Sequence, residues 1–111
     1  MKTLTNLITK VLIILISTIG VVSCGDSPEE LSQKGQDYFK VGNYTEAIKY
    51  FKLSAEQGNG MSQVFLVAMY TDGLGVEQNY YEAEKWLKLA AEQGYEPAIT
   101  LLNSSEDRIY Q

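Results

Sequence analysis

The chain has 111 residues, enough for one small domain, and its 14 Asp and Glu against 9 Lys and Arg make it acidic. An acidic balance gives no basic footprint for nucleic acid, and the absence of His removes the commonest general base and metal ligand. A single Cys excludes an intrachain disulfide and a thiolate zinc cluster. The composition therefore favours a protein that binds rather than catalyses, with no metal or other cofactor and no nucleic-acid partner.

Residues 1–23 have the layout of an export signal. Lys2 and Lys10 supply positive charge, and an uncharged run of 12 residues follows from 11 to 22. A membrane-spanning helix needs about 20 apolar residues, whereas the core of a secretory signal needs about 7–15. The run therefore predicts a signal peptide. An uncleaved N-terminal anchor, or a plain secretory signal that leaves Cys24 as a free thiol, are the alternatives.

The sequence Val21–Cys24 resembles the bacterial lipobox, which has aliphatic and small residues directly before a Cys. The resemblance implies cleavage after residue 23 and lipid on the sulfur and the amine of Cys24, which gives the several acyl chains that stable anchoring requires. We therefore expect a lipidated Cys24 with a polar tether over 24–30. The implied location is the bacterial cell envelope, and Gly25, where an Asp would retain the protein in the inner membrane, favours the outer membrane of a Gram-negative host.

An internal repeat follows the tether. When the chain is shifted by 36 residues, 43–58 falls on 79–94, and eleven of these 16 positions are identical. Each copy places apolar residues at the three- and four-residue spacing of an amphipathic helix. Each copy ends at a glycine, Gly58 or Gly94, where a helix C-terminus favours a residue that adopts positive φ.

Further helices are expected before each copy and after the second one. The first covers 29–41, where Pro28 suits a helix start, and the second covers 61–71. A third begins at Glu96 and aligns with the second at the same shift. The sequence thus predicts an all-α fold, a short α-solenoid of antiparallel helix pairs. About two and a half repeats fill a domain over 31–104, and a polar C-terminal tail follows over 105–111.

The repeat resembles two related families. The first unit is similar to a tetratricopeptide repeat in its ladder of small and aromatic residues, Gly35, Tyr38, Ala47, Phe51 and Ser54. The second unit resembles a Sel1-like repeat, which has a longer turn between its helices, in Leu66, Tyr70, Gly73, Gly75, Val76, Tyr80, Ala83, Trp86, Lys88, Ala90, Ala91, Glu92, Gln93 and Gly94. Val67 departs from the Gly usual at its position. The paired Cys of the cysteine-rich Sel1-like branch are absent, so that branch's penicillin binding does not carry over.

The resemblance implies that the first helix of each pair presents a concave binding surface. By family position the outward-facing residues are Gln36, Phe39, Lys40, Val64, Ala68, Thr71 and Asp72. Phe39 is a large apolar residue placed away from the packing ladder, where it either contacts a partner or lies against the tether. Two and a half repeats are fewer than the three or so that bury a continuous core, so a partner or self-association is expected to add stability.

The leading functional hypothesis is a membrane-anchored adaptor whose repeats bind a protein or peptide. A lipoprotein that neutralises a toxin, with an acidic surface for a basic partner, is the first alternative. An enzyme acting on cell-wall or β-lactam substrates is the second. We expect no enzymatic activity, because Ser54, Ser62 and Ser104 have neither a His nor a suitably spaced Lys.

Overall fold

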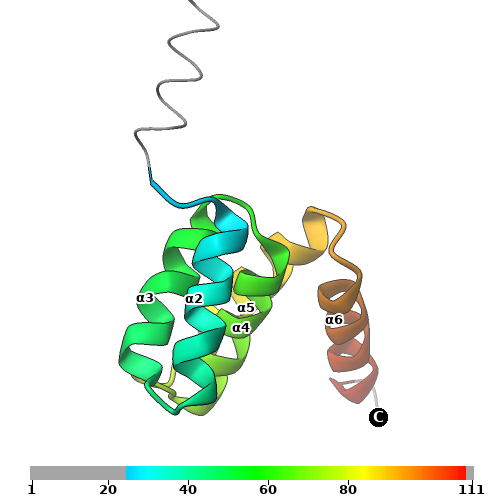
Figure 1. The fold of residues 1–111 in the computed structure, drawn as a ribbon. Coiled ribbons are helices and arrows are strands. Elements are labelled where there is room, and N and C mark those ends of the chain that lie inside the picture. Colours follow the sequence, from blue (N-terminus) through cyan, green and yellow to red (C-terminus); the bar gives the residue numbers. More distant parts are fainter. Residues whose placement is uncertain (1–24, 110–111) are drawn as a thin grey trace, which may run out of the picture.

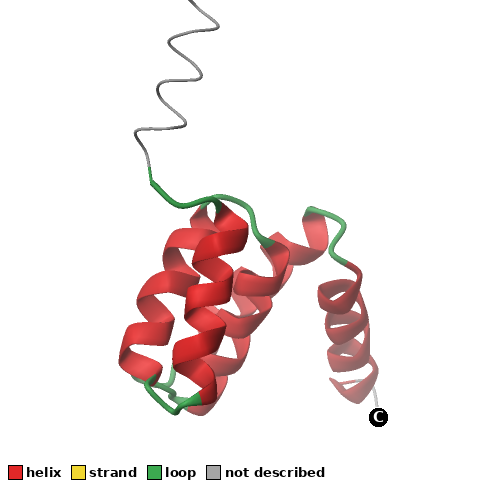
Figure 2. Cartoon of the chain, viewed as in Figure 1, coloured by secondary structure: helices red, strands yellow, loops and turns green. Residues whose placement is uncertain are grey.

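The computed structural model describes residues 25–109, and their side chains as far as Glu106. The predicted signal peptide and Cys24 lie outside the described residues. The described chain forms five helices in the order α2 (Pro28–Lys40), α3 (Tyr44–Glu56), α4 (Gly60–Asp72), α5 (Tyr80–Glu92) and α6 (Glu96–Ile109). Figure 1 shows two helical hairpins, α2–α3 and α4–α5, followed by α6 at the edge of the stack, and Figure 2 shows the described residues as helices and loops without a strand. The predicted all-α solenoid of about two and a half repeats is confirmed.

Side-chain caps fix where the helices begin. At the start of α2 the amide of Ser27 donates to Glu30 Oε2 (2.8 Å) and the amide of Glu30 donates to Ser27 Oγ (3.2 Å), forming a capping box. The next three helices begin after an Asn whose side chain accepts a backbone hydrogen bond, at Asn43, Asn59 and Asn79. Each such cap contributes about 1 kcal/mol to helix stability.

The outer helices extend beyond the limits expected for the domain. Because Ser27 caps α2, this helix begins at Pro28, three residues before the boundary expected at 31. At the other end α6 continues past 104 to Ile109, although the apolar pattern is lost at Ser104. No Gly or Pro interrupts that stretch, so the helix persists after its apolar face has ended.

Aromatic packing forms the centre of the core. Phe51 of α3 is fully buried and its ring stacks on Phe65 of α4, with centroids 4.4 Å apart and planes 8° apart. Gly35 of α2 makes this arrangement possible, because a Cβ there would lie 2.8 Å from the Phe51 ring. In the second repeat the register places Val67 and Leu87 at the positions of Gly35 and Phe51. A larger residue on one helix is thus offset by a smaller one on its partner.

The long turn between α4 and α5 is packed against the first repeat. Leu74 and Val76 lie partly buried against the core, and Gly75 between them has φ +67°. A Cβ on Gly75 would lie 2.4 Å from the carbonyl oxygen of Tyr44, at the start of α3. The turn therefore joins the two repeats and not only α4 to α5. Gly58 and Gly94 also have positive φ, as predicted.

The joint between α5 and α6 is more polar than the equivalent joint between α3 and α4. Ile48 of α3 is 6 % exposed, whereas Glu84, its counterpart in the second copy, is exposed and paired with Lys88. Glu106 of α6 likewise takes the place of the buried Tyr70 of α4. These replacements end the apolar pattern of the stack at α6. None of the helices in the described part of the chain is both long and apolar enough to span a bilayer.

Candidate binding surface

The first helices of the repeats lie in a row. Helix α4 contacts α2 on one side and α6 on the other. Between α4 and the turn before α6 lies a hollow of about 190 Å³, lined by Met61, Val64, Phe65, Ala68 and Tyr95. We call it the α4 hollow. All five lining side chains are apolar or aromatic, so the hollow offers van der Waals contact and little hydrogen bonding.

The two aromatic walls of the α4 hollow pack against neighbouring residues of the domain. Phe65 stacks on Phe51 and meets the Phe39 ring edge-on, with centroids 5.3 Å apart. Tyr95 lies so close to Gly60 that a Cβ on this glycine would be 2.6 Å from Cγ of the tyrosine ring. Both aromatic walls therefore rest on buried or closely packed neighbours, which pre-organises the hollow for a ligand.

Two polar contacts bound the hollow on the side of α2. The amide nitrogen of Gln36 approaches the sulfur of Met61 at 3.3 Å, with the geometry of a weak N–H···S hydrogen bond. The same nitrogen lies 3.5 Å from the hydroxyl of Ser32. The side chain of Met61 is flexible, its sulfur is polarizable, and the residue is 44 % exposed. This wall can therefore adapt to different apolar groups.

The structure brings together only part of the predicted binding surface. Val64 and Ala68 line the α4 hollow and Gln36 contacts its rim. Lys40 and Asp72 are exposed at the C-terminal ends of α2 and α4, where Lys40 pairs with Asp37 at 3.8 Å.

The structure corrects the expected placement of Phe39 and places Thr71 outside the α4 hollow. Phe39 does not lie away from the packing ladder: it packs edge-on against Tyr44, Phe51 and Phe65 and so extends the core. The hydroxyl of Thr71 donates to the carbonyl of Val67 (2.7 Å), and Thr71 lines a different hollow. Helical spacing assigns each residue to a side of its helix but does not show which other elements pack against that side.

Sequence reasoning missed three residues of the hollow, Met61, Phe65 and Tyr95. Met61 stands three residues before Val64 and Phe65 stands three residues before Ala68, so the helical spacing could have added them to the same stripe. Tyr95 belongs to the turn after α5, and no spacing rule brings a turn residue to another helix. Its place follows from the tertiary contact with Gly60.

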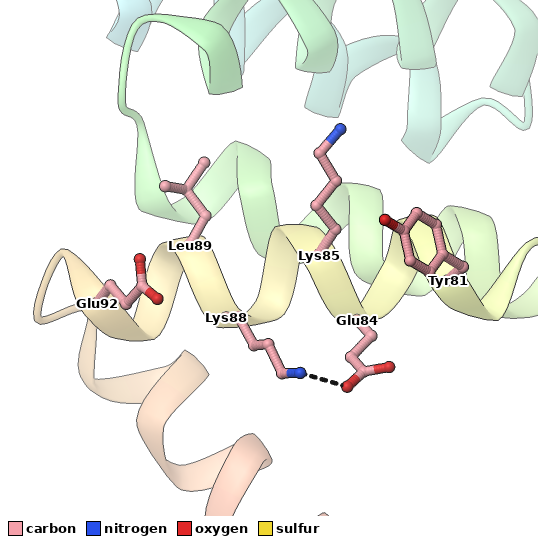
Figure 3. Close-up of a pocket in the computed structure, with 6 residues that line it drawn as sticks. All are labelled: Tyr81, Glu84, Lys85, Lys88, Leu89 and Glu92. Carbon is pink, nitrogen blue, oxygen red and sulfur yellow. Dashed lines mark ion pairs between the residues drawn. The ribbon is translucent and has the colours of Figure 1, made fainter.

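Two larger hollows have different character. One of about 610 Å³ lies between α4, α5 and α6, with apolar Val67 and Leu102 beside Glu84 and Glu106. The other, about 410 Å³, is lined by residues of α5 alone. Figure 3 shows that Glu84 and Lys88 project from one side of this helix, joined by an ion pair of 2.6 Å, while Leu89 projects from the other side. Charged rims make both hollows poorer candidates for an apolar ligand.

The titratable groups form surface pairs and not a reaction centre. Hydrogen bonds to Asp26, Glu46 and Glu84 raise the pKa values of Lys34, Lys49 and Lys88, in that order, above the ordinary lysine value. All three lysines therefore stay protonated throughout the physiological range. No group of three potential metal ligands occurs among residues 25–106.

The candidate serine nucleophiles lack an activating base. Ser54 and Ser62 are buried and hydrogen-bonded to each other at 2.8 Å, and Ser54 also donates to the carbonyl of Pro28 (2.6 Å). Ser104, the third serine considered, is exposed and donates to the carbonyl of Leu101 (2.9 Å). All three hydroxyls are thus hydrogen-bonded. The contacts of Ser54 and Ser62 also join the start of α2 to α3 and α4.

Comparison with known proteins agrees with the fold. A model of the Sel1 repeat matches residues 25–59 and 61–95, which together make up more than half of the chain. The match includes the first unit, whose short turn resembles a tetratricopeptide repeat. No curated protein matches the chain. Sel1 repeats in general mediate protein–protein interaction and are not catalytic modules. The chain therefore belongs to the Sel1 repeat family.

Proposed function

We propose that this Sel1 repeat protein is a lipid-anchored adaptor that binds an apolar segment of another protein in the α4 hollow. The observation that carries the proposal is an apolar recess, open to solvent, whose aromatic walls are fixed by Phe51 and Gly60. Burying one large apolar side chain there contributes about 1.5–3 kcal/mol. A micromolar complex needs about 8 kcal/mol, so the partner makes further contacts along α2 and α4.

We propose that the anchor is lipid on Cys24, which places the protein at the bacterial cell envelope, and at the outer membrane in a Gram-negative host. The lipobox residues before Cys24 support this assignment. Because α2 begins at Pro28, only Gly25–Ser27 separate the cysteine from the first helix, and three residues reach at most about 10 Å. The repeats would then be held close to the membrane surface. Self-association, the other expected source of stability, stays a prediction.

Replacing Cys24 by Ser tests the anchor. We expect the Cys24→Ser chain to take up no labelled fatty acid and to leave the membrane fraction after a carbonate wash, because no acyl chains hold it there. Membrane fractionation with immunoblotting measures the change. Ser23→Ala is the matched control, since it keeps a small residue before the cysteine and should remain lipidated. Retention of the Cys24→Ser chain after the wash would refute the lipid anchor.

Site-specific photocrosslinking tests the binding face. A photoreactive amino acid is placed at Ala68 in the α4 hollow or at Leu89 on α5, both of them exposed helical positions. In intact cells that produce the full chain, we expect position 68 to give a defined crosslinked species and position 89 to give none. The chain keeps Cys24 in this experiment, so the difference in crosslinking between positions 68 and 89 should be that of the normally anchored protein. Equal crosslinking from both positions, or crosslinking from 89 alone, would show that the partner does not occupy the α4 hollow.

A further inference from the structure

The lysines of the folded domain have internal partners, whereas many of its acidic residues do not. Between Gly25 and Glu106 there are thirteen acidic residues and six lysines. Five of these lysines pair with acidic side chains of the domain, and the sixth, Lys52, lies over the Tyr70 ring at 5.7 Å. Internal pairing therefore occupies every described lysine and leaves a surplus of acidic groups. The outward field of the described domain is negative.

Two of the surplus carboxylates follow lining residues of the α4 hollow in the sequence. Asp72 stands one helical turn after Ala68, about 6 Å further along α4, on the same stripe of the helix. Glu96 directly follows Tyr95, which forms the opposite wall. Both side chains are exposed, and neither takes part in an ion pair within residues 25–106. Acidic groups thus adjoin both of the segments that line the recess, α4 and the turn before α6.

We propose that the occupant of the α4 hollow is a cationic segment of a partner protein, with one large apolar side chain between Lys or Arg residues. This inference rests on the proposed function and names the chemistry of its partner. The apolar side chain enters the recess between Val64 and Ala68, and the basic residues face Asp72 and Glu96. An extended chain advances about 3.3 Å per residue, so a basic residue two or three positions from the apolar side chain spans the distance of about 6 Å from Ala68 to Asp72.

The volume and the charge each restrict the partner. A recess of about 190 Å³ holds roughly six water molecules at liquid density, which is room for a single large side chain and not for a whole helix face. Opposite charge speeds association and selects among partners more than it adds affinity. The apolar anchor is therefore expected to set most of the binding strength, and the carboxylates to decide which anchored segments bind.

The test uses the full lipidated chain in detergent micelles and three short probe peptides. The first has one Leu with Lys residues two and three positions away on each side, in a Gly/Ser background. The second replaces Leu by Ala, and the third replaces every Lys by Glu. We follow the methyl NMR signals of Met61, Val64 and Ala68 while each peptide is added. The first peptide should shift these signals, and each of the other two should bind at least about tenfold more weakly.

Two double variants distinguish the effect of Asp72 and Glu96 from the effect of the overall negative charge. Asp72→Asn with Glu96→Gln should weaken binding of the Lys-flanked peptide about three- to tenfold and remove most of its salt dependence. Glu77→Gln with Glu92→Gln removes the same charge at exposed positions outside the α4 hollow and should leave binding nearly unchanged. A larger loss in this control pair would mean that overall charge, and not Asp72 and Glu96, attracts the peptide.

The outcomes distinguish this inference from the proposed function. If the Glu-flanked peptide binds as tightly as the Lys-flanked one, the cationic partner is refuted, while crosslinking from position 68 would still support a partner in the hollow. If no peptide shifts the three methyl signals, the proposed binding of an apolar side chain in the α4 hollow is refuted as well. If position 68 gives no crosslink in cells, the proposed function itself fails, whatever the peptides do.

Discussion

Gly35→Val should lower the free energy of unfolding by about 3 kcal/mol, because α2 and α3 meet at this glycine. A Cβ at Gly35 would lie 2.8 Å from Cδ1 and Cε1 of the Phe51 ring, and the two methyl groups of Val reach further. Phe51 is fully buried and stacked on Phe65, so its ring cannot move aside without disturbing the core. Overpacking of this kind costs about 1–3 kcal/mol and occasionally more. Urea unfolding of the protein, followed by far-ultraviolet circular dichroism, measures the change.

The second repeat suggests how this damage can be repaired. It carries Val67 and Leu87 where the first has Gly35 and Phe51, so the combination of Val and Leu already exists in the same fold. Phe51→Leu alone should destabilise by leaving a cavity. The double variant should be more stable than the sum of the two single effects by about 1–2 kcal/mol, since the smaller side chain makes room for the valine.

A surface substitution controls for the valine itself. Gln33→Val places the same β-branched residue at an exposed position of α2 and should change stability by no more than about 0.5 kcal/mol. If the effects of Gly35→Val and Phe51→Leu simply add, the two positions do not exchange volume, and the interpretation of the second repeat is wrong.

The sequence was sufficient to predict the helices and their pairing, because both depend on local signals. Repeated apolar spacing and the glycines Gly58 and Gly94 mark each second helix, and the positive φ of these glycines agrees. The α4 hollow was predicted only in part, because it depends on contacts between elements. Phe39 was expected at the surface, yet it is partly buried and rings from α3 and α4 pack against it. The sequence does not predict the position of Tyr95, since its contact with Gly60 exists only in the folded domain.

Gly75→Ala is expected to destabilise the domain by about 3 kcal/mol, because two separate costs meet at this residue. Its φ of +67° is unfavourable for a residue with a Cβ by about 1–2 kcal/mol. The new Cβ would also lie 2.4 Å from the Tyr44 carbonyl oxygen and 2.8 Å from the Thr45 amide nitrogen, both in the backbone at the start of α3. Backbone atoms cannot swing aside as a side chain does, so the turn and α3 must separate.

Gly73→Ala supplies the matched control for that experiment. Gly73 has nearly the same φ, +68°, but a Cβ there meets no atom closer than 3.5 Å, so only the backbone cost applies and the loss should be about 1–2 kcal/mol. The difference between the two variants in urea unfolding then measures how strongly the long turn holds the second repeat on the first. Equal losses would mean that the turn serves α4 and α5 alone. A larger loss at Gly75, with faster hydrogen exchange in the first turn of α3, would show that the longer turn of the second unit supplies packing that so short a stack otherwise lacks.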